Sequence, residues 1–170
     1  MVDTGTYLFG YTMNGSDVAQ MDVTDPSGKV SRRTLSSAGQ LLSYTDALGQ
    51  PEEQVTTNTV QSGTNFILPR VDPPNRTASY TYDSLGNTTS VTRLSGTPDA
   101  VTTSFTYEPT FNQIASVTDP LNHTTSYSYD TKGNLTSITN ALNQTTTIAR
   151  NAAGQPVSIT DPLNNTAQFT

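Results

Sequence analysis

Three residues near the start of the chain match a motif for acid chemistry. Asp3-Thr4-Gly5 is the triplet of an aspartic protease, in which two carboxylates share one proton. The sequence holds no second such triplet, so another copy of the chain would have to supply the second carboxylate. We therefore expect a turn at this place and not a catalytic residue.

His123 is the only histidine and thus the only ordinary base at neutral pH. A catalytic triad needs a nucleophile, a base and an orienting group within mutual reach. The matching positions of the neighbouring repeats hold Gln144 and Asn165, which are not bases. We predict a solvated turn side chain at His123 and no enzymatic activity for the chain.

The side chains that could bind metals or cofactors are sparse. Asp- and Asn-rich turns could offer oxygen atoms to Ca²⁺, but the dense alternating acidic loop that calcium sites use is absent. There is no cysteine, which excludes thiolate metal sites and disulfides. Glycine-rich phosphate loops are also absent. We predict no metal and no cofactor.

The composition favours strands with one wet face. The chain has 170 residues, of which 32% are hydrophobic and 13% charged. Its polar residues are mostly Thr, Ser and Asn, and Thr is a good strand former. We expect a thin curved sheet in preference to a two-layer globule.

Charge and hydropathy exclude two classes of partner. The net charge is −6, and only Arg32 and Arg33 are adjacent cations, so we predict no nucleic-acid binding. No apolar run approaches the roughly 18 residues of a membrane helix, so we predict no membrane insertion. The N-terminus lacks the pattern of a secretory signal, and the chain stops inside an expected strand, which suggests a segment of a longer protein.

A repeat of about 21 residues runs through the sequence. In the C-terminal half, Asp119, Asn140 and Asp161 recur in the same local context, and Asp25 and Asp46 show the same step upstream. Two further columns keep the same phase. A glycine follows the Asp or Asn position at Gly39, Gly86, Gly133 and Gly154, and four residues later stand Ser43, Ser90, Ser137 and Ser158.

One repeat is predicted to be two short strands and two turns. Asp and Pro at the start, and Asp with a Gly three residues later, are turn signatures, while the Thr-, Ser- and Tyr-rich stretches between them favour strands. Alternation places Tyr127 and Tyr129 on one face, and Ser137 on the face opposite Ile138. Two repeats are longer, and we predict lengthened turns near residues 50–53 and 94–100. Residues 1–19 form an N-terminal flank, with a degenerate strand as one possibility, and residues 20–170 hold about seven repeats.

The repeat resembles the YD repeat, also called the RHS repeat. The stretch from Tyr129 to Thr139, YDTKGNLTSIT, is a close copy, and the stretch from Tyr82 to Asn87 is a second. Tyr107-Glu108 is a looser copy, and Arg150-Asn151 keeps the phase without the dipeptide. The residues that carry the resemblance are Tyr82, Asp83, Gly86, Asp119, Pro120, Tyr129, Asp130, Gly133, Asp161 and Pro162, with a structural role expected for each.

The resemblance implies an all-β fold and a role in containment. In the family, tandem YD hairpins form a curved antiparallel sheet that spirals into a shell, and in bacterial toxins this shell holds a C-terminal toxic domain. It therefore implies a secreted or cell-surface bacterial protein, whose partners are neighbouring repeats and a C-terminal domain. The autocatalytic core of those toxins is not found here. Open sheet edges would favour self-association.

Exposed tyrosines support a different hypothesis. The chain has eight tyrosines and no tryptophan, and side chains such as Tyr127 and Tyr129 could stack on sugars in a carbohydrate- or cell-surface-binding module. They could equally fill cross-strand pairs within the sheet. A hydrolase is the third and weakest hypothesis.

Overall fold

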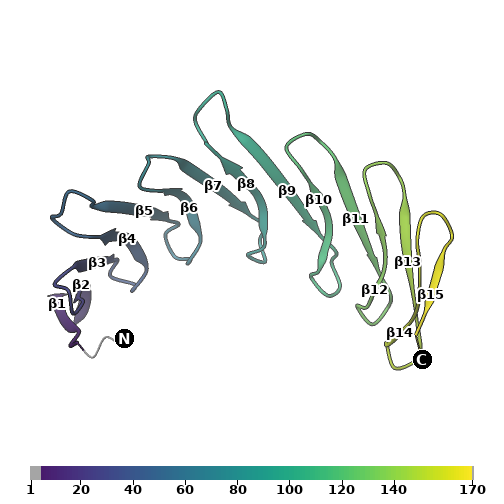
Figure 1. Cartoon of the computed structure of the whole chain (residues 1–170), viewed down its shortest axis with the longest axis horizontal. Helices are drawn as coiled ribbons and strands as arrows, with labels where there is room; N and C mark the ends of the chain where they lie inside the picture. The colour runs from purple at the N-terminus through teal and green to yellow at the C-terminus, as the bar shows by residue number, and fades with distance from the viewer. Residues whose placement is uncertain (1–4, 170) are drawn as a thin grey trace. The chain divides into compact units, whose positions relative to one another are not determined.

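The computed structural model describes residues 5–169, in which fifteen β-strands and no helix are found (Figure 1). Asp3 and Thr4, the first two residues of the protease-like triplet, lie outside the described residues. The strands are β1 (Leu8–Asn14), β2 (Asp17–Thr24), β3 (Val30–Leu35), β4 (Leu41–Asp46), β5 (Gln54–Val60), β6 (Ile67–Val71), β7 (Thr77–Tyr82), β8 (Thr88–Arg93), β9 (Val101–Tyr107), β10 (Ile114–Thr118), β11 (Thr124–Tyr129), β12 (Leu135–Thr139), β13 (Thr145–Arg150), β14 (Pro156–Thr160) and β15 (Thr166–Gln168).

The strands are ordered in the sheet as they are in the chain. Pairing is antiparallel along β1 to β7 and along β9 to β15. The predicted all-β fold of tandem antiparallel hairpins is therefore confirmed. The chain divides into two compact units, one of Met1–Thr81 with Thr92–Ala100 and one of Tyr82–Val91 with Val101–Thr170.

In the first unit, charged side chains link neighbouring strands. The guanidinium of Arg32 on β3 donates two hydrogen bonds of 2.8 Å to the carboxylate of Asp22 on β2. The guanidinium carbon of Arg33 lies 5.1 Å from the centre of the Tyr44 ring on β4, a cation–π contact. Arg33 and Tyr44 are also paired in the β3–β4 ladder, so this contact runs directly across the two strands.

In the second unit, the two faces of the sheet differ in chemistry. One face carries apolar and aromatic cross-strand pairs, namely Phe105 with Val117, Tyr127 with Ile138, and Ile148 with Ile159. The other face carries paired hydroxyl groups 2.6–2.9 Å apart, namely Thr106 with Ser116, Thr118 with Thr124, Thr139 with Thr145, and Thr160 with Thr166. The predicted alternation is confirmed, because Ser137 pairs with Ser128 while Ile138 pairs with Tyr127.

Neither unit has the interior of a two-layer domain. Within residues 5–169, Ala47 is the only buried hydrophobic residue and Thr45 the only buried polar one. Side chains on the apolar face, such as Tyr127 and Ile138, are half-buried by their neighbours in the same sheet. The composition therefore correctly indicated a thin sheet, in which stabilisation comes mainly from ladders and cross-strand pairs.

The two longer repeats differ from the others in more than one place. Turns at residues 47–53 and 94–100 are longer than the turn at residues 119–123, as predicted. However, β5 and β9 have seven residues each, against six in β11 and β13. The turns that follow them, at residues 61–66 and 108–113, are also longer than the turn at residues 130–134. Placing all the extra length in one turn was therefore only partly correct.

Candidate functional site

Asp130 organises the turn that joins β11 to β12. Its Oδ1 atom accepts the backbone N–H groups of Lys132 and Asn134, at 2.8 and 2.9 Å. The backbone N–H of Gly133 donates to the Asp130 carbonyl, which closes a four-residue turn. Gly133 has φ = 81°, the left-handed conformation that follows such a turn in a bulged hairpin. The ladder shifts register between Ser128 and Tyr129, as this bulge requires.

Asp83 holds the earlier copy of this turn in the same way. Its Oδ1 atom accepts the N–H groups of Leu85 and Asn87 at 2.9 Å, and Gly86 has φ = 89°. The Nδ2 atom of Asn87 donates to Oδ2 of Asp83 at 2.8 Å. This side-chain hydrogen bond is the main reason why the pKa of Asp83 is lowered.

In the second unit, the Asp-Pro turns at the other ends of the strands use the same clamp with asparagine in place of glycine. Oδ1 of Asp119 accepts the N–H groups of Leu121 and His123, and Asn122 has φ = 66°. Pro120 stands second, where its fixed φ suits the turn. The turn led by Asp161 and Pro162 repeats this arrangement, with Asn164 at φ = 66°.

His123 is part of its turn clamp. Its Nδ1 atom lies 3.0 Å from Oδ2 of Asp119, and the side chain is 63% exposed. In the Asp161 turn, Asn165 makes the equivalent contact through Nδ2 at 2.8 Å. The pKa of Asp119 is lowered first by the His123 backbone N–H and then by the His123 side chain. The histidine therefore lies where the sequence predicted, in an exposed turn.

A pairing rule links the first and fifth residues of these turns. In most turns led by Asp, the side chain of the fifth residue contacts its Oδ2 atom: Arg76, Asn87, Asn134 and Asn165 donate to it, and Nδ1 of His123 lies 3.0 Å from it. The exception is the Asp25 turn, whose fifth residue, Lys29, donates to Asp46 instead. Where the first residue is Asn, its amide donates to a glutamine oxygen, as Asn140 does to Gln144 and Asn151 to Gln155. Sequence reasoning missed this rule, although the covariation of positions one and five is visible in the repeat.

The tyrosine of the YD dipeptide connects one hairpin to the hairpin before it. The Tyr129 hydroxyl donates to the Ile114 carbonyl on β10 at 2.7 Å, and the Tyr107 hydroxyl donates to the Thr88 carbonyl on β8 at 2.9 Å. Arg150, which occupies the tyrosine position of the next repeat, donates through Nε to the Leu135 carbonyl at 2.9 Å. The lost dipeptide at Arg150 therefore preserves the bridge with a different side chain.

Neighbouring YD-type turns also contact one another. The side-chain amides of Asn87 and Asn112 form a reciprocal pair, with distances of 2.7 and 2.9 Å. The Gln113 amide donates to the Gly133 carbonyl at 2.9 Å, and the Lys132 ammonium donates to the Ala152 carbonyl at 2.7 Å. These contacts hold successive hairpins of the second unit side by side at one end of their strands.

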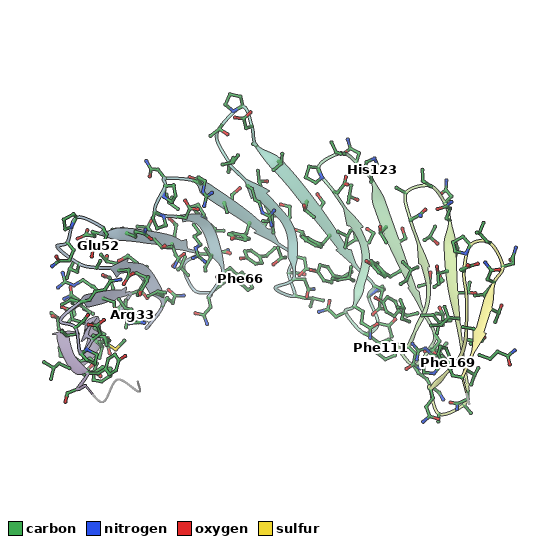
Figure 2. The ribbon with its side chains drawn as sticks, viewed as in Figure 1. Arg33, Glu52, Phe66, Phe111, His123 and Phe169 are labelled. Atoms are coloured by element: carbon green, nitrogen blue, oxygen red, sulfur yellow. The ribbon has the colours of Figure 1, made fainter. Side chains whose placement is uncertain are left out.

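Beside these contacts lies a shallow hollow of about 460 Å³. Its lining includes Glu108 and Phe111 from the turn after β9, and Tyr127, Tyr129 and Asp130 at the end of β11. Figure 2 shows Phe111 and His123 at opposite ends of the strands of the second unit, so the histidine does not take part in this hollow.

The described residues hold neither the pattern of a metal-ligand cluster nor that of a membrane-spanning helix. Within residues 5–169, no group of three or more His, Asp or Glu side chains could hold a metal ion. The same residues contain no helix that is long and apolar enough to cross a membrane.

Comparison with known proteins shows which repeat family and which solved structures these hairpins resemble. The RHS repeat family model matches residues 109–145 and, again, residues 129–166. No curated protein matches the chain. Solved structures do match, among them crystal structures of TcdB2-TccC3-Cdc42 and of TcdB2-TccC3 without its hypervariable C-terminal region. Their TM-scores are 0.65 and 0.64, each with 15% identity over 91% of this chain.

A Tc holotoxin pore structure from Photorhabdus luminescens matches as well, with a TM-score of 0.63 and 16% identity over 91% of this chain. At such identities the likeness shows the fold alone. The chain spans about a tenth of the length of these solved chains, because 10% of each is covered. The matched family model and the phased YD turns show RHS repeats over residues 109–166, and the fold of tandem hairpins continues through the rest of the described residues.

Proposed function

We propose that this chain is a structural wall segment of an RHS/YD-repeat shell, which encloses or presents a toxin or effector domain within a larger protein. The observation that carries the proposal is the bridge to the preceding hairpin made by three YD-position side chains, Tyr107, Tyr129 and Arg150. Such bridges join similar units into an extended sheet without needing a buried core or a catalytic group.

Three further features support this role. The solved structures of similar fold are of Tc toxin components, and TccC3 has a hypervariable C-terminal region, which one of these crystal structures omits. Asp119 and His123 are both used within a turn, which accounts for them without catalysis. We therefore infer that the segment acts by containment and has no activity of its own. By the same family likeness, its working place is the cell surface or the outside of a bacterium.

The partners in this proposal are neighbouring repeats and a C-terminal domain of the parent protein. A test is limited proteolysis of the complete gene product, comparing the native protein with a Tyr129→Phe variant. We expect the region after the repeats to be protected in the native protein and cut faster in the variant. Equal, rapid cleavage of that region in both proteins would contradict containment.

The carbohydrate-binding alternative is less well supported. The Tyr129 hydroxyl already donates its only hydrogen to the Ile114 carbonyl, so it cannot donate to a sugar. The ring of Tyr127 pairs with Ile138 across the ladder, which is the ordinary structural use of tyrosine in a sheet. A glycan array with Tyr127→Ala and Tyr129→Ala variants separates the two hypotheses, since only a binding module gives a signal that these changes remove.

A further inference from the structure

The hollow beside the YD turn combines aromatic rings with carboxylates. Phe111, Tyr127 and Tyr129 contribute rings, and Glu108 and Asp130 contribute carboxylates. The Phe111 side chain is 43% exposed, so one wall of the hollow is an accessible ring. The faces of aromatic rings carry partial negative charge, and they attract cations.

Both carboxylates are ionised at neutral pH. Partial desolvation raises the pKa of Glu108, but the backbone N–H groups of Thr110 and Gln113 outweigh it, and the net pKa is lowered. The pKa of Asp130 is lowered, first by the Asn134 side chain. The hollow thus has two negative charges along its rim.

The nearby cations of the second unit do not neutralise these charges by ion pairing. The Lys132 ammonium donates to the Ala152 carbonyl at 2.7 Å, and the Arg150 guanidinium donates to the Leu135 and Gly154 carbonyls. Within residues 5–169, neither Glu108 nor Asp130 belongs to an ion pair. Both carboxylates accept backbone N–H groups of their own turns, and the Lys132 ammonium acts on Asp130 only from beyond contact distance, so neither charge is neutralised by a contacting cation.

From this combination we infer that the hollow is a binding site for an organic cation, the ammonium or guanidinium group of an amine or of a basic polypeptide side chain. A bare divalent ion would require six or more oxygen ligands, and the three rings make no such ligand set. An anion would be repelled by Glu108 and Asp130. A polypeptide ligand and a free amine share this chemistry, and the site is independent of whether the chain encloses a toxin.

The inference is tested on the intact chain by NMR titration of aromatic ring signals. The probes are tetramethylammonium, N-acetyl-arginine amide and neopentyl alcohol, the last being a neutral molecule of similar shape to the first. We expect both cations to shift the signals of Phe111 and Tyr127 at millimolar concentration, and the alcohol to leave them unchanged. Equal shifts from the alcohol, or none from either cation, would overturn the inference.

Two variants locate the site. Tyr127→Leu removes a ring whose hydroxyl has no hydrogen-bond partner within residues 5–169, so the fold should persist, and it should weaken cation binding several-fold. Glu108→Gln removes one charge and should also weaken it. Tyr11→Leu, which removes an exposed ring in the other compact unit, is the matched control and should bind as the unaltered chain does. Undiminished binding in Tyr127→Leu would refute the assignment.

A short peptide with one arginine distinguishes the two sources of cation. Tighter binding of the peptide than of N-acetyl-arginine amide assigns the site to a polypeptide partner. Equal affinity assigns it to a free amine, and binding of neither excludes both.

Discussion

Tyr129 shows how one side-chain group extends a sheet beyond its backbone ladder. The pairing of β10 with β11 covers only Ser116–Thr118 and Thr124–Ser126. The Ile114 carbonyl lies beyond the last pair, and the Tyr129 hydroxyl reaches it. Because a polar group without a partner in a partly covered place costs free energy, this hydroxyl contributes stability that the ring alone cannot.

The first prediction concerns this hydroxyl. Tyr129→Phe should lower the free energy of unfolding by about 1 kcal/mol, the usual net worth of one hydrogen bond. Tyr127→Phe is the matched control, because it removes the hydroxyl of a neighbouring tyrosine on the same face, and it should change little. Urea denaturation of both variants measures the difference. Equal effects would show that the bridge to Ile114 is not stabilising.

The second prediction separates backbone strain from crowding at a glycine. Gly39→Ala and Gly133→Ala both place a side chain at positive φ, which costs about 1–2 kcal/mol. At Gly133 the new Cβ would also lie 2.9 Å from Cγ of Phe111, whereas nothing lies within 4 Å at Gly39. Thermal unfolding should therefore show the larger loss for Gly133→Ala.

A double variant provides the check. Adding Phe111→Ala to Gly133→Ala removes the ring that crowds the new methyl group, and it should leave only the strain shared with Gly39→Ala. If the excess loss remained, crowding by Phe111 would not be its cause.

For single residues, the sequence predicted the turns but not the side-chain hydrogen bonds that join one hairpin to the hairpin before it. Asp83, Asp130, Gly86 and Gly133 were predicted in turns because Asp and Gly have local backbone preferences that depend on few neighbours. The bridge made by Arg150 could not be predicted, since arginine and tyrosine share no propensity. They share only the reach to a carbonyl of the preceding hairpin.

Among the elements, the turns carry most of the charge of the repeats. Asp25, Asp83, Asp119, Asp130 and Asp161 each lead a turn and accept backbone N–H groups through one carboxylate oxygen. Each has a lowered pKa because the ionised form is the better acceptor. The turns are therefore also acid-sensitive elements.

The third prediction follows from the sign of these shifts. A folded-state pKa below the ordinary value of 3.8 means that the stabilisation is complete above pH 3.8 and is lost as the pH falls through the lower, folded value. Urea midpoints should therefore be steady from pH 7 to about pH 5 and fall below about pH 4. Midpoints that stayed constant down to pH 2.5 would contradict the role of the carboxylates.

Asparagine offers a control for this acid sensitivity. Asn140 and Asn151 lead two turns with the same backbone contacts and carry no charge. Asp130→Asn should therefore fold and show a smaller loss at low pH than the unaltered chain. An unchanged pH profile would mean that the Asp130 turn does not contribute to it.

The strands were predictable for a different reason than the turns. Alternation of Ser or Thr with Tyr or Ile identifies a strand and its two faces from local sequence alone. The extra residues of the long repeats were placed less well, because one added residue in β5 or β9 does not disturb the composition that marks a strand. The extra length of these repeats is shared between the longer strand and the six-residue turn that follows it.

At the scale of the molecule, the sheet lacks the buried core that usually stabilises a chain of this length. Its strands pair in sequence order, and within residues 5–169 the strand β1 has β2 as its only neighbour in the sheet. β1 contains no charged residue and no proline, and its side chains are exposed, with Phe9 at 59% and Tyr11 at 58%. Edge strands usually carry charges or prolines that prevent pairing with other chains.

The fourth prediction is concentration-dependent association through β1. Sedimentation velocity should show larger species as the concentration of the chain rises, and Tyr11→Lys should suppress them by placing a charge on the edge strand. Leu85→Lys adds the same charge at an exposed turn position and should have no such effect. A strictly monomeric chain at high concentration would exclude this edge as a sticky surface.

The short range of every contact described above has a kinetic consequence. Ladders join consecutive strands, and the side-chain hydrogen bonds of Asn87 with Asn112 and of Gln40 with Asn65 each span only 25 residues. Chains with contacts of short sequence separation close small loops first and fold faster than β-proteins with distant pairings. Folding can therefore begin in any group of neighbouring hairpins and spread along the sheet to the next one.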